Sequence, residues 1–340
     1  MPKTATIRDV AQAAGVSKTT AVCVLNHTPH FRVPDQTRQK VQDAARRLGY
    51  RRNAVASALS RGRLHTLGIV CPLYTRHVFP TLNSVYTRAM IVAISDAAHR
   101  VGLRSTLVPL VDGKPLSIAE ISDGRVDGVI LVQVHDAELV RSLYESALPC
   151  VAITAEHCPH SIRPDNRGGA RQAVEHLISL RHRRIAHRSI RDGEAARERR
   201  TGFAEAVTEF GLEPSECPLC LSPESLLEVL QQPKEKRPTA VFAFNDAIAI
   251  EVLRTAVQIG LSVPQDLSLV GFDNDVLAIA CEPQLTTIHN PMSELAEQAV
   301  RVLQALLDKE EPPEILPIPT QIVVRGSSAP PLTMPREEKQ

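Results

Sequence analysis

The sequence of 340 residues contains no tryptophan, and aromatic residues make up only 3% of it. It lacks any run near the roughly 20 apolar residues that a membrane helix needs, so we expect no membrane span. Walker-type loops and Gly-x-Gly-x-x-Gly loops are missing, and no nucleophile–base pair can be identified. We therefore expect no enzymatic activity and no cofactor.

The seven cysteines are odd in number and far apart, and Met1–Thr4 lacks the apolar core of a secretion signal. Both features favour a reducing cytoplasm over a disulfide framework. Cys217 and Cys220 have redox or metal spacing, but no second pair accompanies them. His157, Cys158 and His160 could supply ligands in principle, yet spacing alone predicts no metal site.

Charge is distributed unevenly along the chain. Residues 1–66 hold twelve Lys and Arg against three Asp, a net charge of +9, so the remainder carries −8 of the total of +1. A short basic segment before an acidic body is typical of a segment that meets a polyanion, and nucleic acid is the obvious candidate. A solvated charged arm remains the alternative at this point.

The basic segment predicts three short helices. Apolar positions recur at helical spacing over Ile7–Ala14, Gly15 can end that helix, and Ser17 can cap a second helix that runs to about Leu25. A third amphipathic helix follows Pro34-Asp35 and ends near Gly49, with Leu48 on its inner side. Two helices joined by a short glycine turn form a helix-turn-helix. Such a bundle can also dock proteins, but the charge favours DNA.

These residues resemble a known family. Thr6–Ala11, Ala14–Ser17, Val24–Asn26 and Leu48–Tyr50 are very similar to the headpiece of the lactose/galactose-repressor (LacI/GalR) family. Asn53–Leu59 looks like that family's hinge helix, and the resemblance continues to about Ser327. It implies a headpiece at 1–50, a hinge at 51–65, a body at 66–327 and a flexible tail at 328–340.

The resemblance also implies which residues meet DNA. The implied contacts are Lys18, Thr19, Thr20, Val22, Cys23, Asn26, His27, Asn53, Ala56 and Leu59. Leu59 would be an apolar wedge that unstacks a central base step from the minor groove, the alternative being a plain linker residue. The family usually has Ser-Arg where this chain has Val22-Cys23, so the usual operator sequence is in doubt.

The body predicts an α/β fold. Short apolar runs alternate with helical stretches, and their lack of in/out alternation indicates parallel strands buried on both faces. The runs are Leu67–Val70, Ser105–Val108, Gly128–Val132, Val151–Ile153, Arg184–Ala186, Ala240–Phe244 and Leu267–Gly271. Some 260 residues of this pattern are too long for one sheet and suggest two lobes.

The family resemblance implies a two-lobed, periplasmic-binding-protein-like body with two doubly wound parallel sheets. Lobe 1 would span about 66–163 and 291–320, and lobe 2 about 164–290 and 321–327. Implied effector contacts in the cleft are Phe79, Thr154, Arg199, Asn245 and Asp273. Taken from the residues alone, four of them have a structural alternative: core for Phe79, a solvated helix charge for Arg199, a turn for Asn245 and a helix cap for Asp273.

Several positions depart from the family pattern. Thr154 stands where an acidic residue is usual, Arg76-His77 replaces Asn-Pro, and Ser222-Pro223 lacks the usual aromatic. The cleft therefore looks less sugar-like than the family norm, and an anionic sugar acid or phosphate is one interpretation. His187, Arg188 and Arg191 are expected in a solvated loop, with the cleft or a partner surface as alternatives.

The resemblance implies a cytoplasmic, nucleoid-associated transcription regulator, most simply a repressor. It would bind a pseudo-palindromic double-stranded DNA operator as a homodimer, and a carbohydrate-like effector in the cleft would change operator affinity. The alternative is a solute-binding protein of a transport system, which the basic segment opposes. On this reading, Arg199→Ala and Asp273→Ala are expected to fold and to bind operator like the parent.

Overall fold

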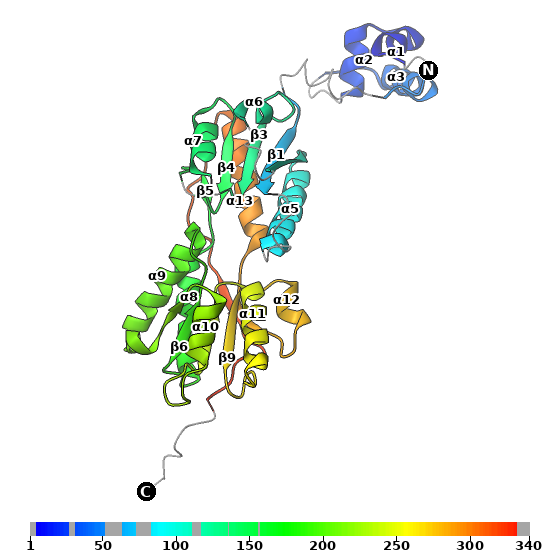
Figure 1. Ribbon diagram of the computed structural model, residues 1–340. Helices are drawn as coiled ribbons and strands as arrows, with labels where there is room; N and C mark the ends of the chain where they lie inside the picture. The colour runs from blue at the N-terminus through cyan, green and yellow to red at the C-terminus, as the bar shows by residue number, and fades with distance from the viewer. Residues whose placement is uncertain are drawn as a thin grey trace. The chain divides into compact units, whose positions relative to one another are not determined.

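The computed structural model describes residues 5–26, 31–51, 63–72, 83–110, 117–134, 136–155 and 157–331. The chain forms two compact units, residues 1–64 and residues 65–340, which are called the head and the body below. Figure 1 colours the head dark blue and the body from light blue to red. Among the described residues, no helix combines the length and apolar composition needed to cross a bilayer.

The head is a bundle whose helix ends are set by local chemistry. Gly15 ends the first helix with φ +65, and the Ser17 hydroxyl accepts a hydrogen bond from the Thr20 backbone N–H at 3.0 Å to begin the second. The predicted helix-turn-helix is thereby confirmed. The helices are α1 (Ile7–Ala14), α2 (Lys18–Leu25) and α3 (Asp35–Arg47).

A small apolar core holds the head together. Its buried members are Val10, Ala11, Ala21, Val24, Val41, Ala44 and Ala45. Leu48, expected on the inner side of the third helix, is instead 38% exposed. The chain reverses at Gly49 (φ +60), which brings Tyr50 rather than Leu48 against the core.

The first lobe of the body contains a parallel sheet with the strand order β2-β1-β3-β4-β5. The strands are β1 (Thr66–Pro72), β2 (Arg104–Leu110), β3 (Gly128–Val132), β4 (Cys150–Ile153) and β5 (Ser161–Ile162). The helices are α5 (Asn83–Arg100), α6 (Ile118–Ile121), α7 (Ala137–Glu145) and α13 (Met292–Asp308). Helix α13 comes from far along the chain, and its apolar side shares one core with α5 and the sheet.

The second lobe contains a sheet with the order β11-β10-β9-β8-β6-β7, parallel except for β10 with β11. The strands are β6 (Ile185–Arg188), β7 (Leu219–Cys220), β8 (Ala240–Ala243), β9 (Ser268–Asp273), β10 (Thr286–His289) and β11 (Gln321–Val323). The helices are α8 (Asn166–Ser179), α9 (Glu194–Glu209), η1 (Pro214–Glu216), α10 (Pro223–Leu230), α11 (Asp246–Gln258) and α12 (Val276–Ala280).

The predicted α/β fold with two doubly wound sheets is confirmed, but one strand differs in character. All seven predicted apolar runs form strands. Strand β2 is an edge strand, however, and Leu107 is 45% exposed, so the expectation of burial on both faces is wrong there. The short strands β5, β7, β10 and β11 were not expected, because none of them forms a continuous apolar run.

Three segments join the lobes. The first lies between β5 and α8, the second is Asn290-Pro291 before α13, and the third follows α13 and leads to β11. The first and third lie side by side, since the Asp165 N–H donates to the Ile318 carbonyl at 2.7 Å and the Ile318 N–H to the Arg163 carbonyl at 2.9 Å. The body therefore has two globular lobes connected by a narrow, hydrogen-bonded waist.

The first residues of the tail that was predicted to be flexible are bound to the second lobe. The Ala329 carbonyl accepts from the Ser268 hydroxyl at 2.8 Å and is 3.0 Å from Nε2 of the buried His182. These polar groups of the second lobe need partners, and the chain end supplies them. Residues 328–331 are thus docked on the lobe, while 332–340 lie outside the described residues.

Candidate DNA-binding helix and candidate ligand cleft

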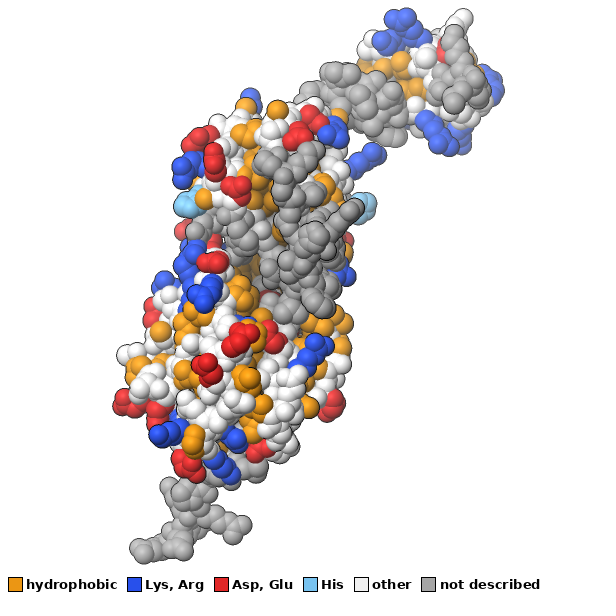
Figure 2. All heavy atoms as spheres, in the orientation of Figure 1, with side chains coloured by type: hydrophobic (Ala, Val, Ile, Leu, Met, Phe, Trp, Pro, Cys, Tyr) orange, Lys and Arg blue, Asp and Glu red, His pale blue; other side chains and the backbone are white. Residues whose placement is uncertain are grey.

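Helix α2 presents the side chains predicted to contact DNA. Lys18 and Thr19 are exposed, whereas Val22, Cys23 and Asn26 are partly buried. The Thr20 hydroxyl lies 2.9 Å from the Ser17 hydroxyl, so it takes part in the helix cap. Figure 2 shows Lys and Arg side chains over the visible face of the head, with little acidic surface between them. The predicted contacts His27, Asn53, Ala56 and Leu59 lie outside the described residues.

A cavity lies between the two lobes, where the carboxyl ends of several parallel strands meet. It contains about 630 Å³ of empty space, counted out to solvent. Four of the five predicted effector residues line it, namely Thr154, Arg199, Asn245 and Asp273. The fifth, Phe79, lies outside the described residues, as do Arg76 and His77.

Arg199 is held in the floor of this cleft with only 3% of its surface exposed. It lies in the second turn of α9, not at the helix start as expected, because the helix begins five residues earlier. Its Nε donates to Asn166 Oδ1 at 2.9 Å, its Nη1 to the Phe244 carbonyl at 2.5 Å, and its guanidinium carbon lies 3.4 Å from the centre of the Phe272 ring. Arg199 is therefore a buried cation that is held by contacts within the fold, and it is not a solvated helix charge.

Asp273 ends β9 and is the buried anion that faces Arg199. Its Oδ1 lies 3.7 Å from Arg199 Nη2 and accepts a hydrogen bond from Asn290 Nδ2 at 3.0 Å. Burial raises the pKa of Asp273 to about 6, and the nearby Arg199 charge only partly offsets this. The helix cap that Asp273 might have served is made by Asp275 instead.

Asn245 combines a structural role with a place in the cleft. Its Oδ1 accepts from the Ile248 backbone N–H at 2.9 Å and so caps α11, a structural role that differs from the turn considered for this residue. The side-chain amide N–H groups are not used by that cap. They remain available to donate to a molecule in the cavity that Asn245 lines.

The first lobe contributes a wall of polar side chains. Burial raises the pKa of Tyr86, whose hydroxyl is hydrogen-bonded to the Thr154 side chain and feels the charges of Asp273 and Arg199 across the cleft. Gln133 and Thr154 follow directly on β3 and β4 and have positive φ angles of 52° and 53°. Non-glycine residues with positive φ angles cluster at ligand sites, where the strained backbone holds a side chain in position for the ligand.

Two buried acceptors of the cleft lack a donor among the described residues. They are Glu194 Oε2, at the start of α9, and Asn290 Oδ1, directly after β10. A buried acceptor without a partner costs about 1–3 kcal/mol, so a donor bound in the cavity would be favoured there. Among the described residues that line the cavity, three are acidic and one is basic. The acidic residues are Asp192, Glu194 and Asp273, and the basic residue is Arg199, so these charges do not favour an anionic ligand.

A chain of polar contacts joins the cleft to two of the lobe connections. Arg163, in the first connection, lies 3.2 Å from Glu194 Oε1, and Asn166, at its end, binds Arg199. On the other side, Asn290 of the second connection binds Asp273. The Arg199–Asp273 pair therefore stands between two segments that must bend when the lobes change their angle.

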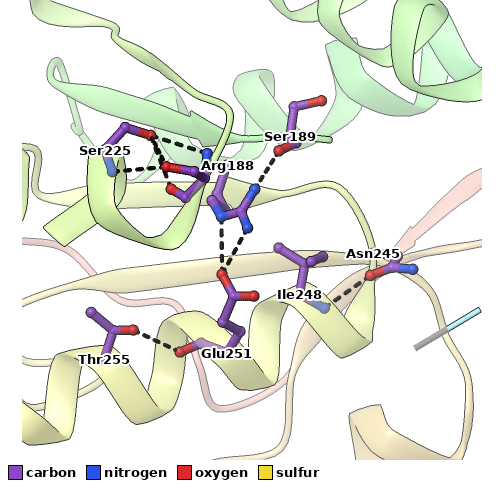
Figure 3. A network of polar contacts seen from close by, with 8 residues as sticks. Arg188, Ser189, Ser225, Asn245, Ile248, Glu251 and Thr255 are labelled. Atoms are coloured by element: carbon purple, nitrogen blue, oxygen red, sulfur yellow. Dashed lines mark hydrogen bonds and ion pairs between the residues drawn. The ribbon is translucent and has the colours of Figure 1, made fainter. Parts of the chain in front are cut away.

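The expected solvated loop at His187 and Arg188 is wrong. Both residues belong to strand β6 and are buried, with 0% and 4% exposure. His187 stacks against the rings of Phe203 and Phe242, and burial lowers its pKa to about 3. Arg188 pairs with Glu251 of α11, and Figure 3 shows this pair beside the Asn245 cap. A strand was predicted at Arg184–Ala186, but periodicity could not show that it continues through the polar residues His187 and Arg188.

Comparison with known proteins decides the family. Residues 6–53 match the family model described as "Bacterial regulatory proteins, lacI family", and residues 174–328 match the "Periplasmic binding protein-like domain". The HTH-type transcriptional regulator DegA of Bacillus subtilis (strain 168) is 31% identical, with 96% of this chain and 98% of that protein covered. The chain belongs to the lacI family.

Other known proteins are similar to this chain over nearly its whole length. Catabolite control protein A of Priestia megaterium is 30% identical, with 95% of this chain and 99% of that protein covered. A crystal structure of the Lac repressor dimer bound to operator and the anti-inducer ONPF is 25% identical, covers 96% of this chain and 100% of its own, and has a TM-score of 0.78. A transcriptional regulator CelR–cellobiose complex is 26% identical, with 95% and 100% covered and a TM-score of 0.66.

The predicted family is thus confirmed, and a DNA-binding transcription regulator is supported over a transport protein. Sequence reasoning missed Gln133, Glu194 and Asn290 as cleft residues. Gln133 could have been found as the first polar residue after an apolar run. Asn290 could not have been, because the strand before it was not recognised.

The raised pKa of Asp273 predicts a pH dependence of stability. Because the folded body favours the protonated carboxyl, this contribution to stability is complete below about pH 4 and is lost as the pH rises through about 6. The free energy of unfolding of the parent should therefore fall by about 2–3 kcal/mol between these pH values, and Asp273→Asn should not show this fall. Urea unfolding of parent and variant from pH 4 to 7.5 measures it. The exposed Asp192→Asn is the control, and identical slopes for parent and Asp273→Asn would contradict the assignment.

Proposed function

We propose that this protein is a ligand-responsive repressor that binds a pseudo-palindromic operator as a homodimer. A small polar molecule in the cleft, most simply a sugar or sugar derivative, changes its operator affinity. The observation that carries this proposal is the Arg199–Asp273 pair, which lines the cleft and binds two lobe connections at once. A ligand that alters this pair alters the contacts that hold the lobe angle.

The basic head supplies the DNA contacts in this proposal. Residues 1–50 form the headpiece, 51–65 the hinge and 66–327 the effector-binding and dimerisation body. Lys18 and Thr19 of α2 are exposed and would reach base edges, while the surrounding arginines would contact phosphate. The proposal that Asn53, Ala56 and Leu59 of the hinge contact DNA rests on the family resemblance alone. The Lac repressor was solved as a dimer on its operator, which supports the same assembly here.

Exposed apolar side chains on the body support a homodimer. Val92 on α5 is 68% exposed, and Val276 and Ile279 on α12 are 60% and 54% exposed. In Figure 1, α5 and α12 lie on the same side of the two lobes. A second copy that covers this side would bury these groups in both lobes, so dimer packing would respond to the lobe angle.

The cleft favours a ligand with several hydrogen-bond donors. Asp273, Glu194 Oε2 and Asn290 Oδ1 can accept, and the Asn245 amide can donate. Neutral polyols such as sugars present hydroxyl groups that satisfy both kinds of partner. The effect on operator affinity is expected to be about 1–3 kcal/mol. The protein would act in the cytoplasm, at the nucleoid.

Operator binding is the experiment that tests the proposal. Random-site selection with the full chain should return pseudo-palindromic sites. Binding to the selected site, measured by fluorescence anisotropy, should weaken with salt along a log–log slope of about −4 or steeper, because several phosphates are neutralised. Non-palindromic sites, or no sites, would contradict a dimeric operator-binding protein.

Ligand response is measured separately. A thermal-shift screen of sugars, sugar acids, sugar phosphates and purines on the parent should show a raised melting temperature with a neutral sugar, because a bound ligand stabilises the folded state. The hit is then added to the operator titration. A hit that leaves operator affinity unchanged would contradict the regulatory role while leaving the DNA-binding role intact.

A further inference from the structure

Two cysteines of the first lobe lie together although eight positions separate them. Cys150 begins β4, and Cys158 lies in the segment between β4 and β5. This segment returns along β4, where the Ala152 N–H donates to the His160 carbonyl at 2.9 Å. Both thiols belong to one buried cluster and are 4% and 6% exposed, and each thiol shifts the pKa of the other.

The surroundings make the two sulfur atoms unequal. The neighbouring Cys150 thiol lowers the pKa of Cys158, whereas the neighbouring Cys158 thiol and burial raise that of Cys150. A thiolate is the reactive form of cysteine, so Cys158 is the better nucleophile. Cys158 also stands between two exposed neighbours, His157 and Pro159, and is therefore close to solvent.

The Cys217/Cys220 pair, which has the spacing of redox motifs, lies in a different environment. Burial raises the pKa of both thiols. The Cys217 thiol donates to the Arg183 carbonyl at 3.7 Å, and no described contact joins it to Cys220. This pair provides an internal comparison within the same chain.

We propose that Cys150 and Cys158 are a peroxide-sensitive thiol pair that forms a reversible intramolecular disulfide. The Cys158 thiolate attacks hydrogen peroxide, an S–O bond forms as the O–O bond breaks, and hydroxide leaves. The Cys150 thiol then gives its proton to hydroxide and attacks the Cys158 sulfenic acid, forming the S–S bond and releasing the hydroxyl group, which ends as water. Two thiols and one peroxide thus yield one disulfide and two waters. A dithiol reductant reverses the reaction.

The disulfide would act on the wall of the ligand cleft. Thr154, which lines the cleft with a positive φ, lies in the segment between the two cysteines. A covalent bond across the base of this segment restricts the positions that Thr154 can take. The pair is a property of the first lobe and does not require a ligand or DNA.

Peptide mass spectrometry on the native, reduced full chain tests the proposal. Trypsin cuts after Arg141 and does not cut the Arg163–Pro164 bond, so residues 142–167 form one peptide that holds both cysteines. After dilute peroxide, denaturation and alkylation, this peptide should have lost two hydrogen atoms and gained no alkyl group. Dithiothreitol should restore alkylation. Loss of alkylation in the peptide 201–234, which holds Cys217 and Cys220, should be at least about tenfold slower.

Single variants separate the two roles. In Cys150→Ser, Cys158 should stop at the sulfenic acid and be captured by dimedone. In Cys158→Ser, and equally in Cys158→Ala, neither product should form. Circular dichroism reports whether each variant is folded, and the native chain gives the result independently of them. Full alkylation of 142–167 after peroxide, a link to another peptide, or faster oxidation of 201–234 would overturn the proposal.

Discussion

Replacing Arg199 by alanine is expected to lower the free energy of unfolding of the body by about 3–5 kcal/mol. Only 4% of the side chain is exposed, and its loss leaves Asp273 as a buried anion without its cation. Asn166 Oδ1 and the Phe244 carbonyl also lose their donors. The structure therefore predicts a less stable variant than the sequence does, because sequence alone did not show how deeply the residue lies.

Urea unfolding followed by far-ultraviolet circular dichroism measures this effect, since the chain has no tryptophan to report by fluorescence. Arg197→Ala is the matched control, because Arg197 lies on the same helix and is exposed. The double variant Arg199→Ala with Asp273→Asn should recover part of the loss, because no charge is then left unpaired. A loss below about 1 kcal/mol in Arg199→Ala would show that Asp273 is satisfied in another way.

Local signals in the head were sufficient to predict its structure. A glycine that takes a positive φ and a serine hydroxyl that caps the next helix are chemical requirements that a sequence displays directly. Long apolar runs predicted β1, β3, β4, β8 and β9 for a similar reason. Leu48 was misplaced because its orientation depends on the chain reversal after it.

Only part of the site could be predicted from the sequence, because its residues are joined by tertiary contacts. Thr154, Asn245 and Asp273 lie at the ends of strands that could be recognised, Arg199 lies in a helix, and all four line the cleft. The partners that give them their properties could not be predicted. Asn290 and Asn166 reach Asp273 and Arg199 from the lobe connections, at sequence separations of 17 and 33 residues.

Glu251→Ala is expected to cost about 3–5 kcal/mol of stability, because it leaves the guanidinium of Arg188 buried without a carboxylate. Arg188 Nε and Nη2 lie 3.0 and 2.9 Å from Glu251 Oε1, and a third donor, Nη1, bonds the Ser189 carbonyl (Figure 3). Arg188 ends β6 immediately before the loop that lines the cleft, and Glu251 lies on the helix that Asn245 caps. The pair therefore ties two sides of the second-lobe half of the cleft together.

Three further variants identify the cause of this loss. Glu251→Gln keeps an acceptor for Arg188 and should lose less than alanine, whereas Arg188→Met with Glu251→Leu removes both charges and should be near neutral. Glu228→Ala, on the exposed side of α10, is the control and should stay within about 0.5 kcal/mol of the parent. If Glu251→Ala unfolds at the same urea concentration as Glu228→Ala, solvent satisfies Arg188 and the pair does not hold the cleft. If the double variant is as unstable as Glu251→Ala, the loss comes from packing at α11 and not from a stranded charge.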